Sequence, residues 1–402
     1  MKEQYGKDGL ITKDKYGDWC VPPEKQELIH SQDPARITDG TLISTAYYYR
    51  LCLWMQKYAK MFGYEHDAAD YARQAAETKA AFNKKFLTVA PLVPPLRGDA
   101  PTNKGNIKSP SPKGEGWGGA GHWLYPDSTF YGNNTQTANL LPYYFGMIDD
   151  EYVKREVEKN IVENIIVRNN GMISTGVIGC SWLMRSLSKM GRGDVAWLLT
   201  TNKKYPSWGY MAEKGATTTW ELWNGDTANP AMNSGNHIML LGDLVTWMFQ
   251  NVGGIRADAA KPGFKHIILK PDYDVDEIDD IEAYYNSIYG KIVSNWRKNA
   301  GKLYWHIEIP ANTTATVYFP YGETKEIGSG VSDFEADCLL SKISRNFENS
   351  NTQNPKIIAN EFLYKSASFP ECHSATMCEL PNGDLVATYF GGTKERNPDC
   401  CI

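Results

Sequence analysis

The pattern of apolar and polar positions divides the chain into a helical part and a later strand-rich part. Apolar residues recur at helical spacing from Leu42 to Leu53. Asp39 or Thr41 can cap this helix, which we expect to end near Tyr58. The following segment, HDAADYARQAAETKAAFNKKFL, is rich in alanine and predicts a second helix.

Further amphipathic segments follow a loop rich in Pro and Gly. They predict helices over residues 134–147, 150–168, 177–190, 193–202 and 235–250. No segment of strand periodicity separates these helices, so we expect an all-α layer packing. Paired helices of this kind can close into a ring whose inter-helix loops form a concave mouth.

From about residue 255 the periodicity changes. Segments such as FKHIILKP, KLYWHIEIP and TATVYFP are β-branched and aromatic, so they predict a small antiparallel β-sandwich. Asn382-Gly383 is a hairpin signal in the tail. We therefore predict a helical domain over 1–253, a β-sandwich over 254–322, a polar linker over 323–360 and a β-rich tail over 361–402.

The aromatic composition suits carbohydrate binding and plain core packing equally well. The chain holds 12 Trp and 24 Tyr, whose rings are common platforms for sugars, although core packing accounts for many of them equally well. A net charge of −5 argues against nucleic acid as a partner. No apolar run is long enough to span a membrane, and MKEQYGKDGL has no apolar export region. The eight cysteines lack zinc-site spacing, and no metal or other cofactor is expected.

One segment, TTTWELWNGD, carries the strongest chemical signal. It places Glu221 between Trp220 and Trp223, after a β-branched run that favours extended backbone. Indole rings exclude water and raise a carboxyl pKa, so hydrogen bonds must limit that rise if Glu221 is to act as a base. Glycoside hydrolysis uses two carboxylates, and Asp226 and Asp18 are the other acids near indoles or this loop. The alternative is that Glu221 is an exposed loop acid that caps a helix.

Four segments carry a family resemblance: YGDWCVP, NNTQTANLLPYYFG, PSWGYMAEKGATTTWELWNGD and NSGNHIMLLGDLVTWMF. In order and spacing they resemble the catalytic domain of α-L-rhamnosidases of glycoside hydrolase family seventy-eight, over roughly residues 5 to 250. The β segments resemble that family's C-terminal sandwich. The resemblance implies a multi-domain, mainly α fold, with a partial (α/α)6 barrel, a small all-β sandwich and a short β-rich tail. It also implies inverting hydrolysis of terminal α-L-rhamnosyl residues from glycosides or plant polysaccharides.

The resemblance also assigns roles to individual residues. Glu221 matches the general base that draws a proton from the attacking water. His237 matches a histidine near the bound sugar, and Trp19 matches an indole that lines the pocket. The same motifs add Asp18, Trp220 and Trp223 as sugar-binding candidates. Packing explains Trp223 at least as well as sugar binding.

The sequence departs from the family in two places. The family's general acid precedes the GDW element, in a segment resembling RDERxxW, and this chain has no such segment. We therefore expect the C-terminal part of a rhamnosidase, inactive or weakly active by itself, whose parent enzyme is periplasmic or secreted. The tail, HSATMCELPNGDLVATYFGGTKERNPD, resembles the opening strands of sialidase-like β-propellers but is too short for sialidase activity.

Two classes of function stay open. The first is an inverting α-L-rhamnosidase with a rhamnoside substrate. The second is a non-catalytic rhamnoside-binding or vestigial fragment. Another α/α-barrel glycosidase, or a polysaccharide lyase, is a weaker alternative.

Overall fold

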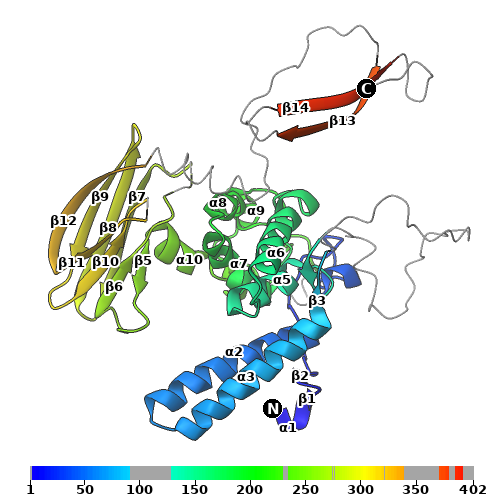
Figure 1. Cartoon of the computed structure of the whole chain (residues 1–402), viewed down its shortest axis with the longest axis horizontal. Coiled ribbons are helices and arrows are strands. Elements are labelled where there is room, and N and C mark those ends of the chain that lie inside the picture. Colours follow the sequence, from blue (N-terminus) through cyan, green and yellow to red (C-terminus); the bar gives the residue numbers. More distant parts are fainter. Residues whose placement is uncertain are drawn as a thin grey trace, which may run out of the picture. The chain divides into compact units, whose positions relative to one another are not determined.

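The computed structural model describes two compact units, Met1–Thr352 and Gln353–Ile402 (Figure 1). Within them the described residues are 2–90, 128–229, 234–273, 275, 277–320 and 322–338, together with the backbone of 371–379 and 385–392. The first unit contains the helices and most of the strands. The second contains one hairpin of strands. The two units are treated separately below.

A long helical hairpin opens the first unit. Short elements precede it: α1 (Lys2–Tyr5), β1 (Gly6–Lys7), β2 (Leu10–Ile11) and the 3-10 turn η1 (Pro34–Arg36). Helices α2 (Gly40–Met61) and α3 (Glu65–Phe86) then run antiparallel, side by side (Figure 1). The Asp39 carboxylate accepts a hydrogen bond from the Thr41 N–H at 2.7 Å, which confirms the predicted cap.

Further helices continue the pairing. They are α5 (Gln136–Phe145), α6 (Glu151–Glu163) with its π-helical extension η2 (Asn164–Arg168), α7 (Val177–Lys189), α8 (Gly193–Thr201) and α9 (Trp208–Glu213). Strands β3 (Leu87–Thr88) and β4 (Phe130–Tyr131) pair just before α5. Helix α2 packs against α5, and α5 against α7. The predicted helices from 134 to 202 are thus confirmed, whereas the short helix α9 was not predicted.

The predicted helix over 235–250 is wrong as a continuous element. The chain forms a 3-10 turn η4 (Met239–Leu241), a short α10 (Leu244–Trp247) and a π-helical turn η5 (Met248–Val252). Gly242 causes the break, because its φ of 58° is left-handed and a Cβ there would lie 2.4 Å from the Cys180 carbonyl oxygen. The apolar spacing that predicted one helix is therefore shared among three turns.

Two four-stranded sheets form the β part of the first unit. The strands are β5 (Ile255–Ala257), β6 (His266–Leu269), β7 (Asp280–Ser287), β8 (Gly290–Asn299), β9 (Lys302–Ile309), β10 (Thr314–Tyr318), β11 (Thr324–Ile327) and β12 (Gly330–Asp337). The sheet orders are β11-β10-β6-β5 and β12-β9-β8-β7. Trp296 and Trp305, each 1% exposed, contribute to the core of this sandwich. The predicted sandwich is confirmed.

Two details of the β part differ from the sequence prediction. Strands β10 and β6 are parallel, because the chain crosses to the other sheet through β7–β9 before it returns. Strands β11 and β12 lie where a linker was predicted from residue 323, so that boundary is wrong. Their outward-facing polar residues hid the strand pattern, while pairing with β10 and β9 satisfies their backbone.

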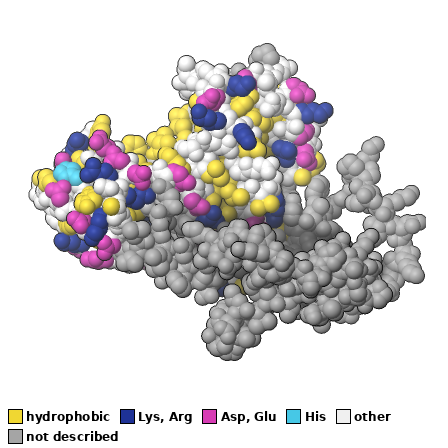
Figure 2. Space-filling model, turned by 90° about the horizontal axis from the view of Figure 1, so that it is seen from above, with side chains coloured by type: hydrophobic (Ala, Val, Ile, Leu, Met, Phe, Trp, Pro, Cys, Tyr) yellow, Lys and Arg dark blue, Asp and Glu magenta, His cyan; other side chains and the backbone are white. Residues whose placement is uncertain are grey.

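The tail and the surface complete the description. In the second unit, β13 (Glu371–Glu379) pairs antiparallel with β14 (Leu385–Gly392), which confirms a hairpin around the Asn382-Gly383 signal. The turn itself lies outside the described residues. On the face seen in Figure 2, acidic and basic side chains are interspersed over the sandwich, which lies to the left. No helix among the described residues is long and apolar enough to cross a membrane.

Candidate active site

Glu221 lies in an irregular loop that follows α9. Its N–H donates to the Ser234 carbonyl oxygen at 2.9 Å, and its Oε2 accepts a hydrogen bond from the Ser234 N–H at 3.1 Å. A second pair of bonds lies close by: the His237 N–H donates to the Thr219 carbonyl, and the Thr219 hydroxyl donates to the His237 carbonyl. The segments that carry Glu221 and His237 are therefore joined at two neighbouring residue pairs. The carboxylate is half-buried and fixed by backbone.

The two indoles beside Glu221 anchor this loop. Trp220 is 9% exposed and lies against Gly225, where a Cβ would come within 2.6 Å of the indole ring. Trp223 is 1% exposed, and its Nε1–H donates to the Thr175 carbonyl at 3.0 Å. Its ring also meets the edge of Trp208, with centroids 5.8 Å apart. The structure therefore assigns Trp223 to the core instead of a sugar-contacting surface.

Asp18 has a structural position as well. Its carboxylate accepts N–H bonds from Gly176 at 2.9 Å, Ile178 at 2.8 Å and Gly179 at 3.1 Å, and it accepts the hydroxyl bond of Thr137. These amides open α7, whose own N-cap residue, Gly176, has no side chain to accept them. Burial raises the pKa of Asp18, and the hydrogen bonds act against that rise.

A sugar-binding role for Asp18 does not fit this arrangement. The side chain is buried, and both of its oxygens are occupied by protein donors. Close packing encloses it further, because a Cβ on Gly179 would lie 2.1 Å from the Thr137 hydroxyl oxygen. Asp18 fixes the amino ends of α5 and α7 relative to the segment that carries Trp19.

Trp19 keeps a position suited to a binding surface. Its half-buried ring lies between Tyr16 and His30, at centroid distances of 5.4 and 4.8 Å. The next residue, Cys20, is buried and has a left-handed φ of 62°. Burial raises the pKa of the Cys20 thiol to about 12, and the nearby carboxylates of Glu221 and Asp18 add to the rise. The Trp19 segment therefore lies beside the Glu221 loop.

Several residues that build this region were not predicted. Asn224 is fully buried, and its Nδ2 donates to the carbonyls of Gln26 and Leu28. The Thr227 hydroxyl donates to Gln26 as well, at 2.8 Å. The adjacent Asn-Gly-Asp letters suggested only a turn, so nothing in the sequence showed that Asn224 ties this loop to the chain's first thirty residues. The Asp226 Oδ2 accepts the Tyr210 hydroxyl at 2.8 Å and lies 3.7 Å from the Lys214 Nζ.

His237 is held mainly through its backbone. Its ring is half-buried, and its Nδ1 is enclosed without a hydrogen-bond partner among the described residues. An orphaned buried nitrogen costs free energy, so such a group is often kept for a purpose other than stability. The loops of Glu221, His237 and Trp19 thus lie close together, whereas the side chains of Asp18 and Trp223 are buried in the core.

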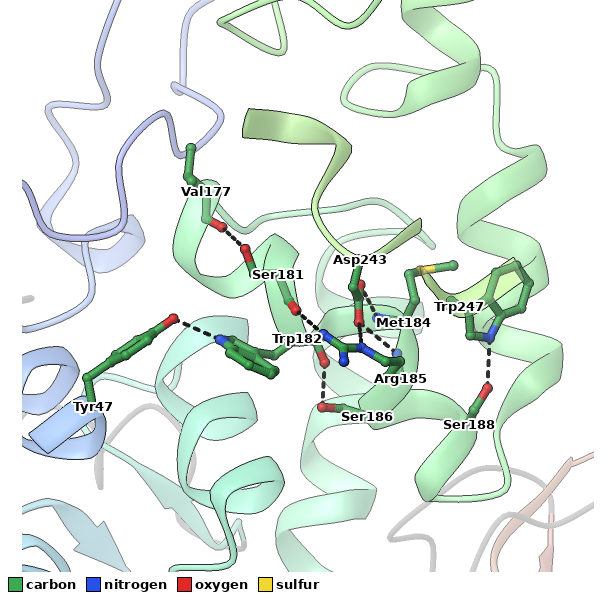
Figure 3. Close-up of polar contacts among 10 residues, drawn as sticks. All are labelled: Tyr47, Val177, Ser181, Trp182, Met184, Arg185, Ser186, Ser188, Asp243 and Trp247. Atoms are coloured by element: carbon green, nitrogen blue, oxygen red, sulfur yellow. Dashed lines mark hydrogen bonds and ion pairs between the residues drawn. The ribbon is translucent and has the colours of Figure 1, made fainter. Parts of the chain in front are cut away.

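A polar network farther along α7 holds this scaffold together. Asp243 accepts the N–H bonds of Met184 and Arg185 and an ion pair from Arg185 Nε at 3.1 Å, all visible in Figure 3. Trp247 Nε1–H donates to the Ser188 hydroxyl at 2.7 Å (Figure 3). Burial raises the pKa of Asp243, against the opposing effect of its bonds to Met184 and Arg185. The network fixes α10 against α7, next to the Glu221 and His237 loops.

Paired helices whose loops gather a carboxylate and an indole, followed by a β-sandwich, form the architecture of multi-domain helical-hairpin glycosidases. Comparison with family models identifies the family. Residues 1–252 match the bacterial α-L-rhamnosidase six-hairpin glycosidase domain, and residues 254–332 match the bacterial α-L-rhamnosidase C-terminal domain. The chain belongs to the bacterial α-L-rhamnosidase six-hairpin glycosidase family.

Individual relatives agree with this assignment. An α-L-rhamnosidase of Streptomyces avermitilis is 31% identical over 78% of this chain and 25% of its own length. The solved α-L-rhamnosidase of Dictyoglumus thermophilum is 28% identical, with a TM-score of 0.65 over 84% of this chain and 35% of that one. A Streptomyces avermitilis rhamnosidase structure, solved with L-rhamnose, shares the fold at 23% identity and a TM-score of 0.65, over 83% and 29%. The chain thus spans about a quarter to a third of the length of these relatives.

Proposed function

We propose that this chain supplies the general-base side of an inverting α-L-rhamnosidase site, with Glu221 as the base. The observation that carries the proposal is the Glu221 carboxylate, half-buried and held by the Ser234 amide in a loop tied to His237. Family membership supplies the reaction class. The Streptomyces avermitilis structure solved with L-rhamnose supports the sugar class.

The geometry of Glu221 suits a general base. The Ser234 N–H holds one oxygen of the carboxylate in place, and a carboxylate is a group that can accept a proton from water. The loop is fixed by backbone bonds on both sides, so the carboxylate needs little reorganisation to hold a water molecule. Trp19 offers an indole face to the apolar side of a sugar ring, and His237 is proposed as a neighbour of the bound sugar.

Asp18 and Asp226, the two other acids that the sequence suggested, are not placed to act as the general acid. An inverting acid must reach the leaving oxygen, with about 6.5–9.5 Å between the two carboxyls. Asp18 is enclosed by four donors, and the Asp226 carboxylate binds Tyr210 and Lys214. The proposal for this chain is therefore limited to the base side of the pair.

Glu221→Gln tests the proposal directly. On an aryl α-L-rhamnoside with a good leaving group, which needs little protonation, we expect turnover to fall by about 10²-fold or more. Glu277→Gln, an exposed acid in the β part, is the control and should leave turnover unchanged. NMR should show the inverted anomer of rhamnose first. Equal rates for Glu221→Gln and the unmodified chain would remove Glu221 from the mechanism.

A second candidate is rhamnoside binding without hydrolysis. The enclosure of Asp18 and the pairing of Asp226 favour it, since neither acid is placed to protonate a leaving group. Titration calorimetry with L-rhamnose separates the two. Heat of binding that Trp19→Ala abolishes, in a chain with no turnover of the aryl rhamnoside, would support the binding function over the enzyme.

A further inference from the structure

The segment 22–32 lies against the loop that carries Glu221 and is fixed there by a buried side chain. Asn224 follows Glu221 by three residues and is fully buried. Its Nδ2 donates hydrogen bonds to the carbonyls of Gln26 and Leu28, in the middle of the segment. Buried hydrogen bonds of this kind hold two irregular pieces of chain in one register. The backbone of the segment is therefore positioned by the same loop that positions the proposed base.

Contacts within the segment keep its shape. The Glu24 carboxylate accepts hydrogen bonds from the Ser31 hydroxyl at 2.8 Å and from the Gln32 N–H at 3.1 Å, so the two ends of the segment are closed on each other. Ile29 is half-buried and packs against the hydrophobic core. The next residue, His30, therefore follows an anchored position, and its backbone is held by the segment around it.

The His30 ring contacts the Trp19 indole and keeps its polar atoms available. The two ring centroids are 4.8 Å apart and the ring planes are inclined by 64°. The His30 side chain is exposed, and within the described residues its nitrogens make no hydrogen bond. An imidazole can donate a hydrogen bond from one nitrogen and, when neutral, accept one at the other. A ring fixed beside Trp19 thus offers both kinds of hydrogen bond to a hydroxyl group.

The order of contacts places His30 beyond Trp19 as counted from Glu221. Cys20 directly follows Trp19, and the Glu221 carboxylate is close enough to add to the rise that burial causes in the pKa of the Cys20 thiol. His30 makes a ring contact with Trp19 and, within the described residues, no hydrogen bond or ion pair with Glu221. A rhamnosyl ring between Glu221 and Trp19 therefore leaves His30 for the group that is joined to that ring.

The charges around His30 favour a neutral group. Within the segment the charged side chains are Glu24, Lys25 and Glu27, all exposed, which gives two carboxylates against one ammonium. A uronic acid in this place would meet more like charge than opposite charge. A neutral sugar meets no such repulsion, and its hydroxyls match the donor and the acceptor of an imidazole.

We propose that His30 is a specificity-determining residue of the rhamnoside site, and that its imidazole hydrogen-bonds a hydroxyl of a neutral sugar joined to the rhamnosyl ring. The inference rests on the proposed function and adds a substrate class to it, a rhamnosyl disaccharide or longer glycan. Asn224 is the positioning residue, because it fixes the segment of His30 relative to Glu221.

Titration calorimetry on the full chain tests the proposal. The chain carries Glu221→Gln, so that no glycoside is consumed. The ligands are L-rhamnose, disaccharides in which α-L-rhamnose is joined to O2, O4 or O6 of glucose, and 4-nitrophenyl α-L-rhamnoside. Each is titrated with and without His30→Ala. His66→Ala, whose side chain is 97% exposed at the start of α3, is the matched control. His30→Gln keeps a hydrogen-bonding group and is the conservative variant.

We expect one or more disaccharides to bind more tightly than L-rhamnose. His30→Ala should weaken that disaccharide about five- to tenfold, the effect of one hydrogen bond, and should change L-rhamnose binding by less than about twofold. His30→Gln should restore most of the loss, and His66→Ala should change neither ligand.

Three results would overturn the proposal while the proposed function stands. The first is L-rhamnose binding with no gain from any disaccharide. The second is an equal weakening of both ligands by His30→Ala, which would make His30 a support for Trp19 alone. The third is a larger loss for the nitrophenyl rhamnoside than for the disaccharides, which would assign His30 to an aromatic group. A chain that does not bind L-rhamnose at all would overturn the proposed function, and this inference with it.

Discussion

At the scale of single residues, two acids of similar sequence context have opposite environments. Asp18 and Glu221 each lie beside an indole in an irregular segment. Asp18 accepts four protein donors and is buried, whereas Glu221 accepts one backbone amide and is half-buried. The sequence predicts Glu221 through its local motif. The role of Asp18 could not be predicted, because its donors are more than 110 residues away along the chain.

Asp18→Asn measures the structural role of this carboxylate. An amide keeps the shape but presents N–H groups to amides that need an acceptor. We expect the free energy of unfolding to fall by about 2–4 kcal/mol. Urea unfolding followed by circular dichroism at 222 nm gives the value. Asp150→Asn is the matched control, because that exposed cap makes one bond, to the Val153 N–H, and Asn caps equally well. Equal losses in the two variants would contradict this role for Asp18.

At the scale of elements, the sequence predicts the regular helices and strands. It does not predict the places where tertiary contacts determine the backbone conformation or the strand pairing. Helices α2 and α3 are confirmed because apolar spacing, a cap and alanine content agree. The helix break at Gly242 could not be predicted from the sequence, because it depends on the left-handed φ of Gly242 and its close approach to the Cys180 backbone. Strands β11 and β12 were not predicted, because they are edge strands with exposed polar faces and their sequence is typical of a linker.

A pH-dependent contact joins strands β9 and β12. His306 on β9 lies opposite Asp333 on β12, with Nδ1 and Oδ1 2.7 Å apart, and its Nε2 is 3.4 Å from Glu308. The bond to Asp333 chiefly raises the pKa of His306 above 6.5. The contact therefore stabilises the fold fully below pH 6.5, and this stabilisation is lost as the pH rises through the raised pKa.

A double-mutant cycle with His306→Gln and Asp333→Asn isolates the contact. Because the side chains of His306 and Asp333 are 39% and 76% exposed, solvent screens the pair and we expect a coupling free energy of only about 0.2–1 kcal/mol at pH 5.5. At pH 8.5 the coupling should approach zero. Urea unfolding of the four proteins at the two pH values gives both numbers. A coupling that grows with pH would show that the His306–Asp333 pair is not the origin of the pH dependence.

At the scale of the whole first unit, a buried junction joins the helical part to the sandwich. The Ser294 hydroxyl on β8 donates to the Gly253 carbonyl at 2.7 Å and accepts the Trp305 Nε1–H at 3.1 Å. Trp296 Nε1–H donates to the Val252 carbonyl at 2.9 Å. Side chains of the sandwich thus satisfy the carbonyls at the end of η5. The end of the helical part is built against the strands, which predicts that the two parts unfold together.

Ser294→Ala tests that coupling. Ser294 is fully buried, so removing its hydroxyl leaves the Gly253 carbonyl without this donor and the Trp305 indole N–H without its acceptor. Each of the two orphaned groups costs about 1–3 kcal/mol, so we expect a loss of about 2–6 kcal/mol. Ser287→Ala removes a hydroxyl that donates to the Gly290 carbonyl and accepts the Tyr289 N–H, both within one half-buried turn, and should lose no more than about 1 kcal/mol. Thermal unfolding is followed by the helical signal at 222 nm and by tryptophan fluorescence, which reports the buried indoles of both parts. If the junction couples the parts, both signals shift to the same lower temperature in Ser294→Ala. A fluorescence transition that splits into two steps, with the helical signal at 222 nm following only one of them, would show two parts that unfold independently across the junction.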